Sequence, residues 1–345
     1  MEPLRERPFF ILGQPRSGTT LLRAIANSHP RLYVPPETGF LPFLRIGGRA
    51  PAGDEPLTQD QAAALLEQIS RLNQEWDGLV RDPAAFYYGL CAGREAPTVT
   101  AVLDALYRRM MGDQGERWGD KTPSYVRYIT AIDRLFPAAQ FVHVIRDARD
   151  TVLSARDKWE DQRHLDSYYL LRHWVESVSA GRREGARLGP ARYLEVRYED
   201  LVARPAETVR EVCDFLGETF HPAMLDHTRQ FQEEIAAGGK RRGGHPEVRN
   251  PIFTSSAGRW RREMGPFDRK LARYLAGPVL RALAYETPET GPWTAGERVR
   301  LALLALRYHL LAGARRLLYA TGVLTLNRGK RSKTSIARRE RSQTP

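Results

Sequence analysis

Residues 9–20, FFILGQPRSGTT, are the most informative stretch of this sequence. The apolar residues 9–12 predict a buried strand of a parallel sheet, and residues 19–27 predict a helix. Between the two lies a loop bounded by Gly13 and Gly18. Glycine at both ends permits a tight turn, and the backbone amides at the start of the following helix can bind an anion. The stretch therefore predicts a strand, an anion-binding loop and a helix, in that order.

The loop differs from the nucleotide P-loop at one informative position. Both have two glycines separated by four residues, but the P-loop continues with lysine, whereas this sequence has Thr19 there. The loop thus lacks the cation that holds the terminal phosphates of a nucleoside triphosphate. Arg16, inside the loop, instead offers a planar set of donors to a phosphate or sulfate. We expect an anion that is not a nucleoside triphosphate; the alternative is a glycine turn that binds nothing.

The remaining sequence up to residue 290 alternates predicted strands with predicted helices. Residues 140–145, QFVHVI, predict a second buried strand, and residues 191–196, ARYLEV, predict a third strand. Helices are predicted at 57–76, 98–112, 124–136, 168–188, 205–216 and 259–283, with another after residue 149. Alternating strands and helices imply right-handed crossovers. The sequence therefore predicts an α/β fold, with a P-loop-like parallel sheet flanked by helices, in a domain of residues 1–290.

A second candidate anion site follows the strand at 140–145. Arg146 stands at the carboxyl end of that strand, where open α/β sheets bind ligands, and Ser154 follows in the next predicted helix. Together they can hold a second phosphate. The alternative is that Arg146 only forms an ion pair with Asp147 or Asp150. Two anion sites at two strand ends suit a nucleotide with a 5′-phosphosulfate and a 3′-phosphate.

Most of the positive charge lies in the C-terminal residues. The chain has a net charge of +12, and residues 298–345 account for +11 of it. Such a distribution argues against nucleic-acid binding by the main domain, and we expect no nucleic-acid partner. Residues 291–327 predict an amphipathic basic helical extension, and residues 328–345 predict a disordered basic tail. The helix can dock on the body, or residues 297–345 can make a peripheral contact with an anionic membrane.

Other sequence signals bear on localisation and metal binding. We find no signal peptide and no uncharged apolar run long enough to span a membrane. Cys91 and Cys213 fit no disulfide or zinc spacing. We therefore expect a cytoplasmic protein, or one held peripherally at the inner membrane surface. The sequence has no HExxH motif and no Cys/His cluster, so no metal is expected.

The two candidate anion sites resemble those of sulfotransferases that use 3′-phosphoadenosine 5′-phosphosulfate (PAPS). Residues 15–22, PRSGTTLL, resemble the loop that binds the 5′-phosphosulfate. Residues 141–154, FVHVIRDARDTVLS, resemble the strand and helix that bind the 3′-phosphate. The order of PRSGTTLLRA, His29-Pro30 and Glu37-Thr38 is most similar to the tyrosylprotein sulfotransferase branch and its bacterial relatives. The resemblance covers residues 8–286.

The resemblance also implies roles for individual residues. The catalytic base falls on Glu37, and the catalytic lysine falls on Lys121 within WGDKTP. The residues implied to bind PAPS are Arg16, Ser17, Gly18, Thr19, Thr20, Arg146 and Ser154. Arg16 and the amides of residues 17–20 would hold the 5′-phosphosulfate.

The sequence departs from the tyrosylprotein branch near Asn250, where that branch has lysine. Its matching serine would fall near Gly244. Arg249 and Ser255 or Ser256 can substitute for them.

Taken together, the sequence predicts a sulfotransferase that moves a sulfuryl group from PAPS to an acceptor hydroxyl by in-line displacement. Glu37 would take the acceptor's proton, and Lys121 would neutralise the leaving oxygen. The acceptor can be a small molecule, a glycan, a lipid or a peptide. One alternative is a P-loop small-molecule kinase using ATP, which Thr19 argues against; another is a non-catalytic anion-binding or nucleic-acid-binding module. His143 lies inside a predicted strand, and we expect it to be packed rather than catalytic.

Overall fold

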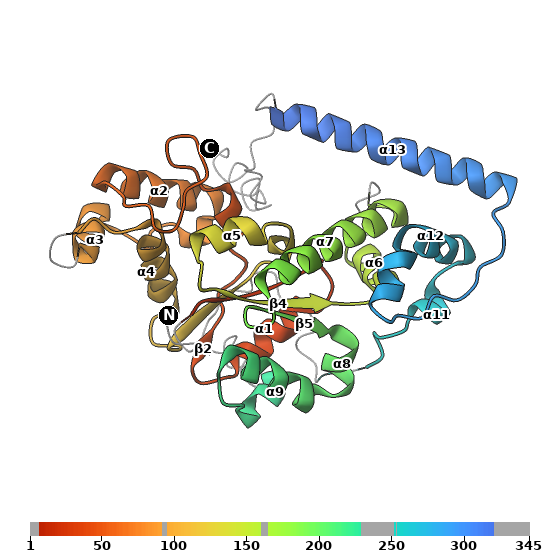
Figure 1. The fold of residues 1–345 in the computed structure, drawn as a ribbon, viewed down its shortest axis with the longest axis horizontal. Helices are drawn as coiled ribbons and strands as arrows, with labels where there is room; N and C mark the ends of the chain where they lie inside the picture. The colour runs from red at the N-terminus through yellow and green to blue at the C-terminus, as the bar shows by residue number, and fades with distance from the viewer. Residues whose placement is uncertain (1–6, 92–94, 160–164, 229–251, 253, 321–345) are drawn as a thin grey trace, which may run out of the picture.

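The computed structural model describes residues 7–91, 95–159, 165–228, 252 and 254–320. Its centre is a five-stranded, all-parallel sheet in the order β2-β3-β1-β4-β5 (Figure 1). The strands are β1 (Phe9–Gly13), β2 (Leu32–Tyr33), β3 (Arg117–Lys121), β4 (Gln140–Ile145) and β5 (Tyr193–Arg197). The predicted α/β fold with a parallel sheet is confirmed.

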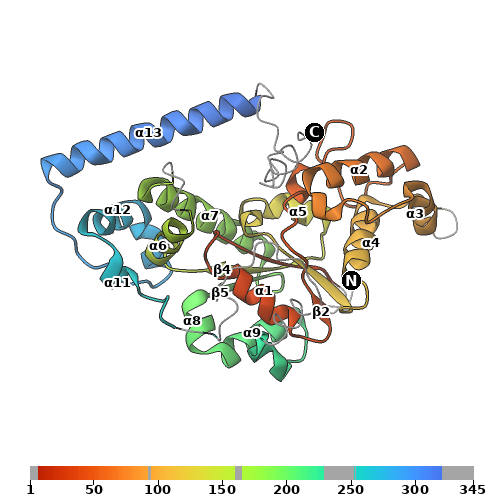
Figure 2. The same ribbon diagram turned by 180° about the vertical axis from the view of Figure 1, so that it is seen from behind.

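The sheet has helices on both faces (Figures 1 and 2). They are α1 (Thr19–Asn27), α2 (Gln59–Leu72), α3 (Pro83–Leu90), α4 (Val99–Met111), α5 (Ile129–Leu135), α6 (Ala148–Lys158), α7 (Ser167–Leu188), α8 (Tyr198–Ala203), α9 (Pro205–Leu216), α11 (Trp260–Glu263), α12 (Pro266–Ala282) and α13 (Ala295–Ala320). Helices α1, α8 and α9 lie on one face, and α2, α4 and α5 lie on the other.

The alternation of side chains along β1 explains this two-sided packing. Phe9 and Ile11 join the core beneath α1 and α9, whereas Phe10 and Leu12 join the core beneath α2, α4 and α5. Successive side chains of a strand point to opposite faces, so an unbroken apolar run indicates a strand that is covered on both sides. β1 is central because it pairs with β3 on one edge and with β4 on the other.

Several elements differ from the predictions, including the unpredicted helices α3 and α8. β2 has only two residues, and β3 reads RWGDK, which has no apolar run, so neither was predicted. The predicted helix at 124–136 is a 3₁₀ turn, Pro123–Arg127, followed by α5. The predicted helix at 259–283 is interrupted before Pro266, which occupies the first turn of α12 where its missing N–H costs nothing.

The described part of the C-terminal extension forms a long helix, α13, which contacts α7 along one side. The predicted tail at 328–345 lies outside the described residues. Within the described part of the chain, no helix has both the length and the apolar composition that crossing a bilayer requires.

Candidate active site

The loop between β1 and α1 has the geometry of an anion cradle. Gly18 precedes α1 with a φ of 100°, and a Cβ atom there would lie 2.4 Å from Cδ2 of Tyr198. Arg16 also has a positive φ, 76°, which is strained for a residue with a side chain. The hydroxyl of Ser17 is buried and has no hydrogen-bond partner among the described residues. The loop thus keeps a strained backbone and an unsatisfied buried donor beside a helix N-terminus, which favours an anionic ligand.

The structure brings Arg16, Arg146 and Ser154 together at the carboxyl ends of β1 and β4. Arg146 donates from Nη1 to the backbone oxygen of Arg16 at 3.2 Å. Nε of Arg16 donates to Oγ of Ser154 at 3.2 Å. The guanidinium of Arg146 also lies 4.5 Å from the centre of the Tyr198 ring, and its buried Nε has no partner among the described residues. The two predicted anion sites are therefore neighbours in one region.

The alternative role for Arg146, pairing with a neighbouring acid, is not what the structure shows in the described residues. Asp147 instead pairs with Arg149 at 2.5 Å. Asp150 accepts hydrogen bonds from the backbone amides of Gly258 and Trp260, at 2.6 and 2.8 Å. Because both acids are engaged elsewhere, the guanidinium of Arg146 remains beside the loop.

The contacts of Asp150 hold the segment that carries Ser256 against this region. Nη2 of Arg146 donates to the backbone oxygen of Ser256 at 2.6 Å, and the Ser256 hydroxyl lies 2.6 Å from the Tyr198 hydroxyl. Of the serines that could complete the site, the structure thus places Ser256 in contact with Arg146, whereas Ser255 is exposed. Gly244, Arg249 and Asn250 lie outside the described residues.

Glu37 and Lys121 form an ion pair beside the same loop. Nζ of Lys121 lies 2.6 Å from Oε1 of Glu37 and 3.3 Å from Oγ1 of Thr20. The side chain of Lys121 is 5% exposed, whereas that of Glu37 is 51% exposed. Burial lowers the pKa of Lys121, and the Glu37 carboxylate opposes that shift. A buried cation and an accessible carboxylate therefore lie at the start of α1.

A buried polar cluster behind the pair aligns it. Oδ2 of Asp120 accepts hydrogen bonds from the hydroxyls of Thr38 at 2.5 Å and Tyr107 at 2.6 Å. Asp120 adjoins Lys121 and Thr38 adjoins Glu37, so this contact ties together the backbones that carry the pair. Asp120 is fully buried, and the loss of hydration raises its pKa to about 6. Its other carboxylate oxygen has no partner among the described residues.

His143 is packed inside the sheet, as expected. It is fully buried in β4, and its Nδ1 lies 2.5 Å from the Tyr193 hydroxyl. Burial lowers the pKa of His143 to about 3, so the imidazole is neutral at physiological pH. The described residues contain no group of three or more His, Cys, Asp or Glu side chains that could hold a metal ion.

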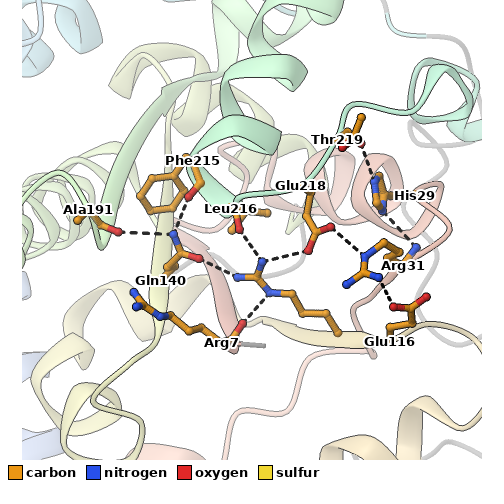
Figure 3. Close-up of polar contacts among 11 residues, drawn as sticks. Arg7, His29, Arg31, Glu116, Gln140, Ala191, Phe215, Leu216, Glu218 and Thr219 are labelled. Carbon is orange, nitrogen blue, oxygen red and sulfur yellow. Dashed lines mark hydrogen bonds and ion pairs between the residues drawn. The ribbon is translucent and has the colours of Figure 1, made fainter. Parts of the chain in front are cut away.

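The amino ends of the strands carry a different network, which is structural (Figure 3). Arg117 starts β3 and is almost fully buried. It donates to the backbone oxygen of Leu216 and the side chain of Gln140, both at 2.7 Å, and pairs with Glu218 at 3.2 Å. Burial lowers its pKa to about 10, so the guanidinium stays charged. The two ends of β3 thus differ in role: Arg117 connects α9 to the sheet, whereas Lys121 is part of the candidate site.

The residues that support the site were not identified as functional from the sequence. Thr38 and Asp120 stand within motifs that carry the resemblance, so a place in a motif is the signal that could have identified them. Asp150 had been considered only as a competing ion-pair partner. No local signal selected Ser256 over Ser255, because the choice depends on the fold of a segment 110 residues from Arg146.

Comparisons with known proteins agree with this geometry. The model of the Sulfotransferase family matches residues 8–222. Protein-tyrosine sulfotransferase A of Caenorhabditis elegans is 25% identical over 300 residues, which cover 85% of this chain and 71% of that protein. The Drosophila melanogaster protein-tyrosine sulfotransferase is 25% identical over 290 residues, covering 82% of this chain and 52% of that protein. The chain therefore spans about half the length of the latter.

A solved structure shows the same fold. The sulfotransferase domain from the Synechococcus PCC 7002 olefin synthase superposes with a TM-score of 0.53 at 26% identity. The match covers 84% of this chain and 99% of that domain.

Proposed function

The chain belongs to the sulfotransferase family, and on that basis we propose that it transfers a sulfuryl group from PAPS to a hydroxyl acceptor, with Glu37 as the base. One observation carries the proposal: Nζ of Lys121 lies within reach of both Glu37 and Thr20. A candidate base, a cation that can stabilise the leaving oxygen and the candidate anion-binding loop are therefore in one place. Enzymes of this kind work mainly through positioning and electrostatic stabilisation, which such an arrangement supplies.

The donor-binding residues suit PAPS. Ser17 and Arg146 each have a buried donor with no partner in the described residues. Arg16 links Arg146 to Ser154, because its backbone oxygen accepts from Arg146 and its side chain donates to Ser154. The loop amides of residues 17–20 would bind the 5′-phosphosulfate, and Arg146 with Ser154 would bind the 3′-phosphate.

The role of Arg16 has two candidates. The family resemblance assigns its guanidinium to the 5′-phosphosulfate. The contact with Ser154 supports a place at the 3′-phosphate instead. Nucleotides with and without a 3′-phosphate distinguish these two roles.

In the proposed reaction, a bond forms between the acceptor oxygen and sulfur while the bond from sulfur to the 5′-phosphate oxygen breaks. The proton of the acceptor hydroxyl passes to Glu37, because a neutral hydroxyl is a weak nucleophile. Lys121 stabilises the negative charge that develops on the leaving oxygen. The products are a sulfate ester and adenosine 3′,5′-bisphosphate.

The acceptor reaches the site from the solvent side of Glu37, since half of this side chain is exposed while Lys121 is buried. We propose a hydroxyl of a small molecule, glycan, lipid or peptide as the acceptor.

Calorimetry with nucleotides tests the donor assignment directly. The full chain should bind adenosine 3′,5′-bisphosphate in the absence of metal, and more tightly than it binds ATP with Mg²⁺. Tight binding of ATP with Mg²⁺, without binding of the bisphosphate, would instead support a kinase.

A further inference from the structure

Helix α13 has an apolar face that packs on the body. Leu301, Leu304 and Tyr308 are partly buried in the core that α6, α7 and α12 share. The Tyr308 hydroxyl donates to Glu176 on α7 at 2.8 Å. Lys270 on α12 pairs with Glu297 in the first turn of α13 at 2.8 Å. The helix is therefore docked along one side.

The opposite side of α13 is also apolar. Val299, Leu303, Leu306 and Leu310 are 57–64% exposed. Their spacing of three or four residues places them in one stripe along the helix. Among the described residues, this helix carries most of the large apolar side chains that are exposed. In Figures 1 and 2, α13 lies at the periphery, with α7 and α12 on one side and no labelled helix or strand on the other.

A helix with two opposite apolar faces needs two partners, because a helix with a single partner is polar on its outer side. The body is one partner of α13. The second partner would contact the exposed stripe, which consists of Val299, Leu303, Leu306 and Leu310.

Basic residues border the exposed stripe on both sides. By helical spacing, Arg300 and Arg307 lie along one border and Arg298 lies along the other, and all three are exposed. Arg307 also pairs with Asp166, which places that border next to the body. An apolar stripe between basic borders is the pattern of a helix that lies in the plane of an anionic membrane surface.

The charge of this region also argues against two other occupants. Residues 298–345 have a net charge of +11, so the basic residues beside the stripes of two copies of the chain would repel each other. The C-terminal residues 321–345 are a second possible occupant of the stripe. They carry seven Lys and Arg and one acid, so they would bring more positive charge next to the basic residues that border it. An anionic lipid surface complements both the stripe and its borders, because polybasic segments are attracted to anionic headgroups.

We propose that the outer face of α13 binds the surface of an anionic membrane, with Val299, Leu303, Leu306 and Leu310 entering the boundary between headgroups and acyl chains. The helix lies in the membrane plane and does not cross it. Its inner face remains on α7, so the α/β domain is held at the membrane surface.

Vesicle flotation with the full chain tests this. Vesicles of phosphatidylcholine with 30% phosphatidylglycerol are compared with vesicles of phosphatidylcholine alone. We expect binding to the anionic vesicles only. The triple variant Leu303→Ser, Leu306→Ser, Leu310→Ser should bind them at least about tenfold more weakly, because apolar burial contributes to such binding. These side chains are exposed, so the melting temperature should stay that of the wild type.

Tyr88→Ser is the matched control. Tyr88 is 64% exposed on α3, at the opposite end of the molecule from α13 (Figure 1), and its loss should leave vesicle binding unchanged. The proposal is overturned if the wild type ignores anionic vesicles, or if the triple variant binds them like the wild type, since charge alone would then explain binding. A wild-type dimer that the triple variant dissociates, without vesicle binding, would show that a second copy covers the stripe.

Discussion

The Nζ atom of Lys121 lies 2.6 Å from Oε1 of Glu37, although 84 residues separate the two in the chain. Lys121 ends β3, and Glu37 lies in the segment after β2. The contact exists because β2 and β3 are parallel neighbours in the sheet, so their carboxyl ends, and the segments that follow them, lie at the same edge. Thr20, at the start of α1, completes the group.

Replacing Glu37 with Gln should abolish transfer while donor binding persists. The amide keeps the size of the side chain but cannot accept the acceptor's proton, which typically reduces the rate by about 10²- to 10⁴-fold. Calorimetry with adenosine 3′,5′-bisphosphate and release of this nucleotide from PAPS in an acceptor screen measure the two effects. Glu207→Gln on α9, at a side chain 68% exposed, is the control and should be silent. Full turnover by Glu37→Gln would assign the base to another residue.

Replacing Arg146 with Ala should weaken binding of adenosine 3′,5′-bisphosphate by roughly 10- to 100-fold, the usual value of hydrogen bonds to a charged group. Adenosine 5′-monophosphate lacks the 3′-phosphate, so its affinity should change little. Arg156→Ala, on the same helix as Ser154 and half exposed, is the matched control. Equal losses for both nucleotides would contradict a role at the 3′-phosphate.

The same two nucleotides separate the two roles of Arg16. If its guanidinium serves the 3′-phosphate together with Ser154, Arg16→Ala should weaken only the bisphosphate, as Ser154→Ala should. If it serves the 5′ end, both nucleotides should bind more weakly. The contact between Arg16 and Ser154 favours the first result. Calorimetry on the two variants decides between them.

Asp120 should make a contribution to the stability of the fold that falls as the pH rises from about 4 to 6. Burial raises its pKa from 3.8 to about 6, so in this range the folded state binds more protons than the unfolded state. The cost reaches about 3 kcal/mol above pH 6, since one pKa unit corresponds to about 1.4 kcal/mol. Asp120→Asn should remove this part of the slope.

Urea unfolding between pH 4 and 8 measures the effect. The difference between wild type and variant isolates Asp120, because other buried acids with raised pKa values, such as Glu199 and Asp150, contribute to both proteins. Parallel stability curves would show that Asp120 does not titrate in this range.

Replacing Arg117 with Met should destabilise the fold without changing the affinity of the donor site. Removing one partner of a buried ion pair typically costs about 3–5 kcal/mol. Arg31, which also pairs with Glu218 but is one-third exposed, offers a control, and Arg31→Met should cost less than about 1 kcal/mol. Urea unfolding gives the stabilities, and calorimetry on the folded proteins gives the affinity. A loss of donor affinity in Arg117→Met would show that the two ends of β3 are coupled.

Local signals were sufficient for much of the fold. β1 is an unbroken apolar run and β4 is mostly apolar, and the glycine loop stands directly between β1 and α1, so short windows of sequence are sufficient to predict these elements. β3 was missed because its burial does not come from apolar residues. Arg117 is buried only because Gln140, Leu216 and Glu218, which are distant in sequence, satisfy its donors.

The site residues were named through the resemblance of motifs, and the structure shows which of them meet. Arg16 and Arg146 come together because β1 and β4 are adjacent in the sheet. The sequence predicts that each residue follows a strand, but it does not predict that the two strands are neighbours. The hydrogen bond between Thr38 and Asp120, and the choice of Ser256 as a partner of Arg146, had no signal in the sequence.

Residues that are close together in the chain were sufficient to predict the class of fold, the glycine loop and the motifs of the family. The ion pair of Lys121 with Glu37, the contact of Ser256 with Arg146 and the exposed apolar face of α13 could be seen only in the folded chain. These contacts depend on the order of strands and the packing of distant helices. Side-chain partners separated by many residues are set by that packing and not by local preference.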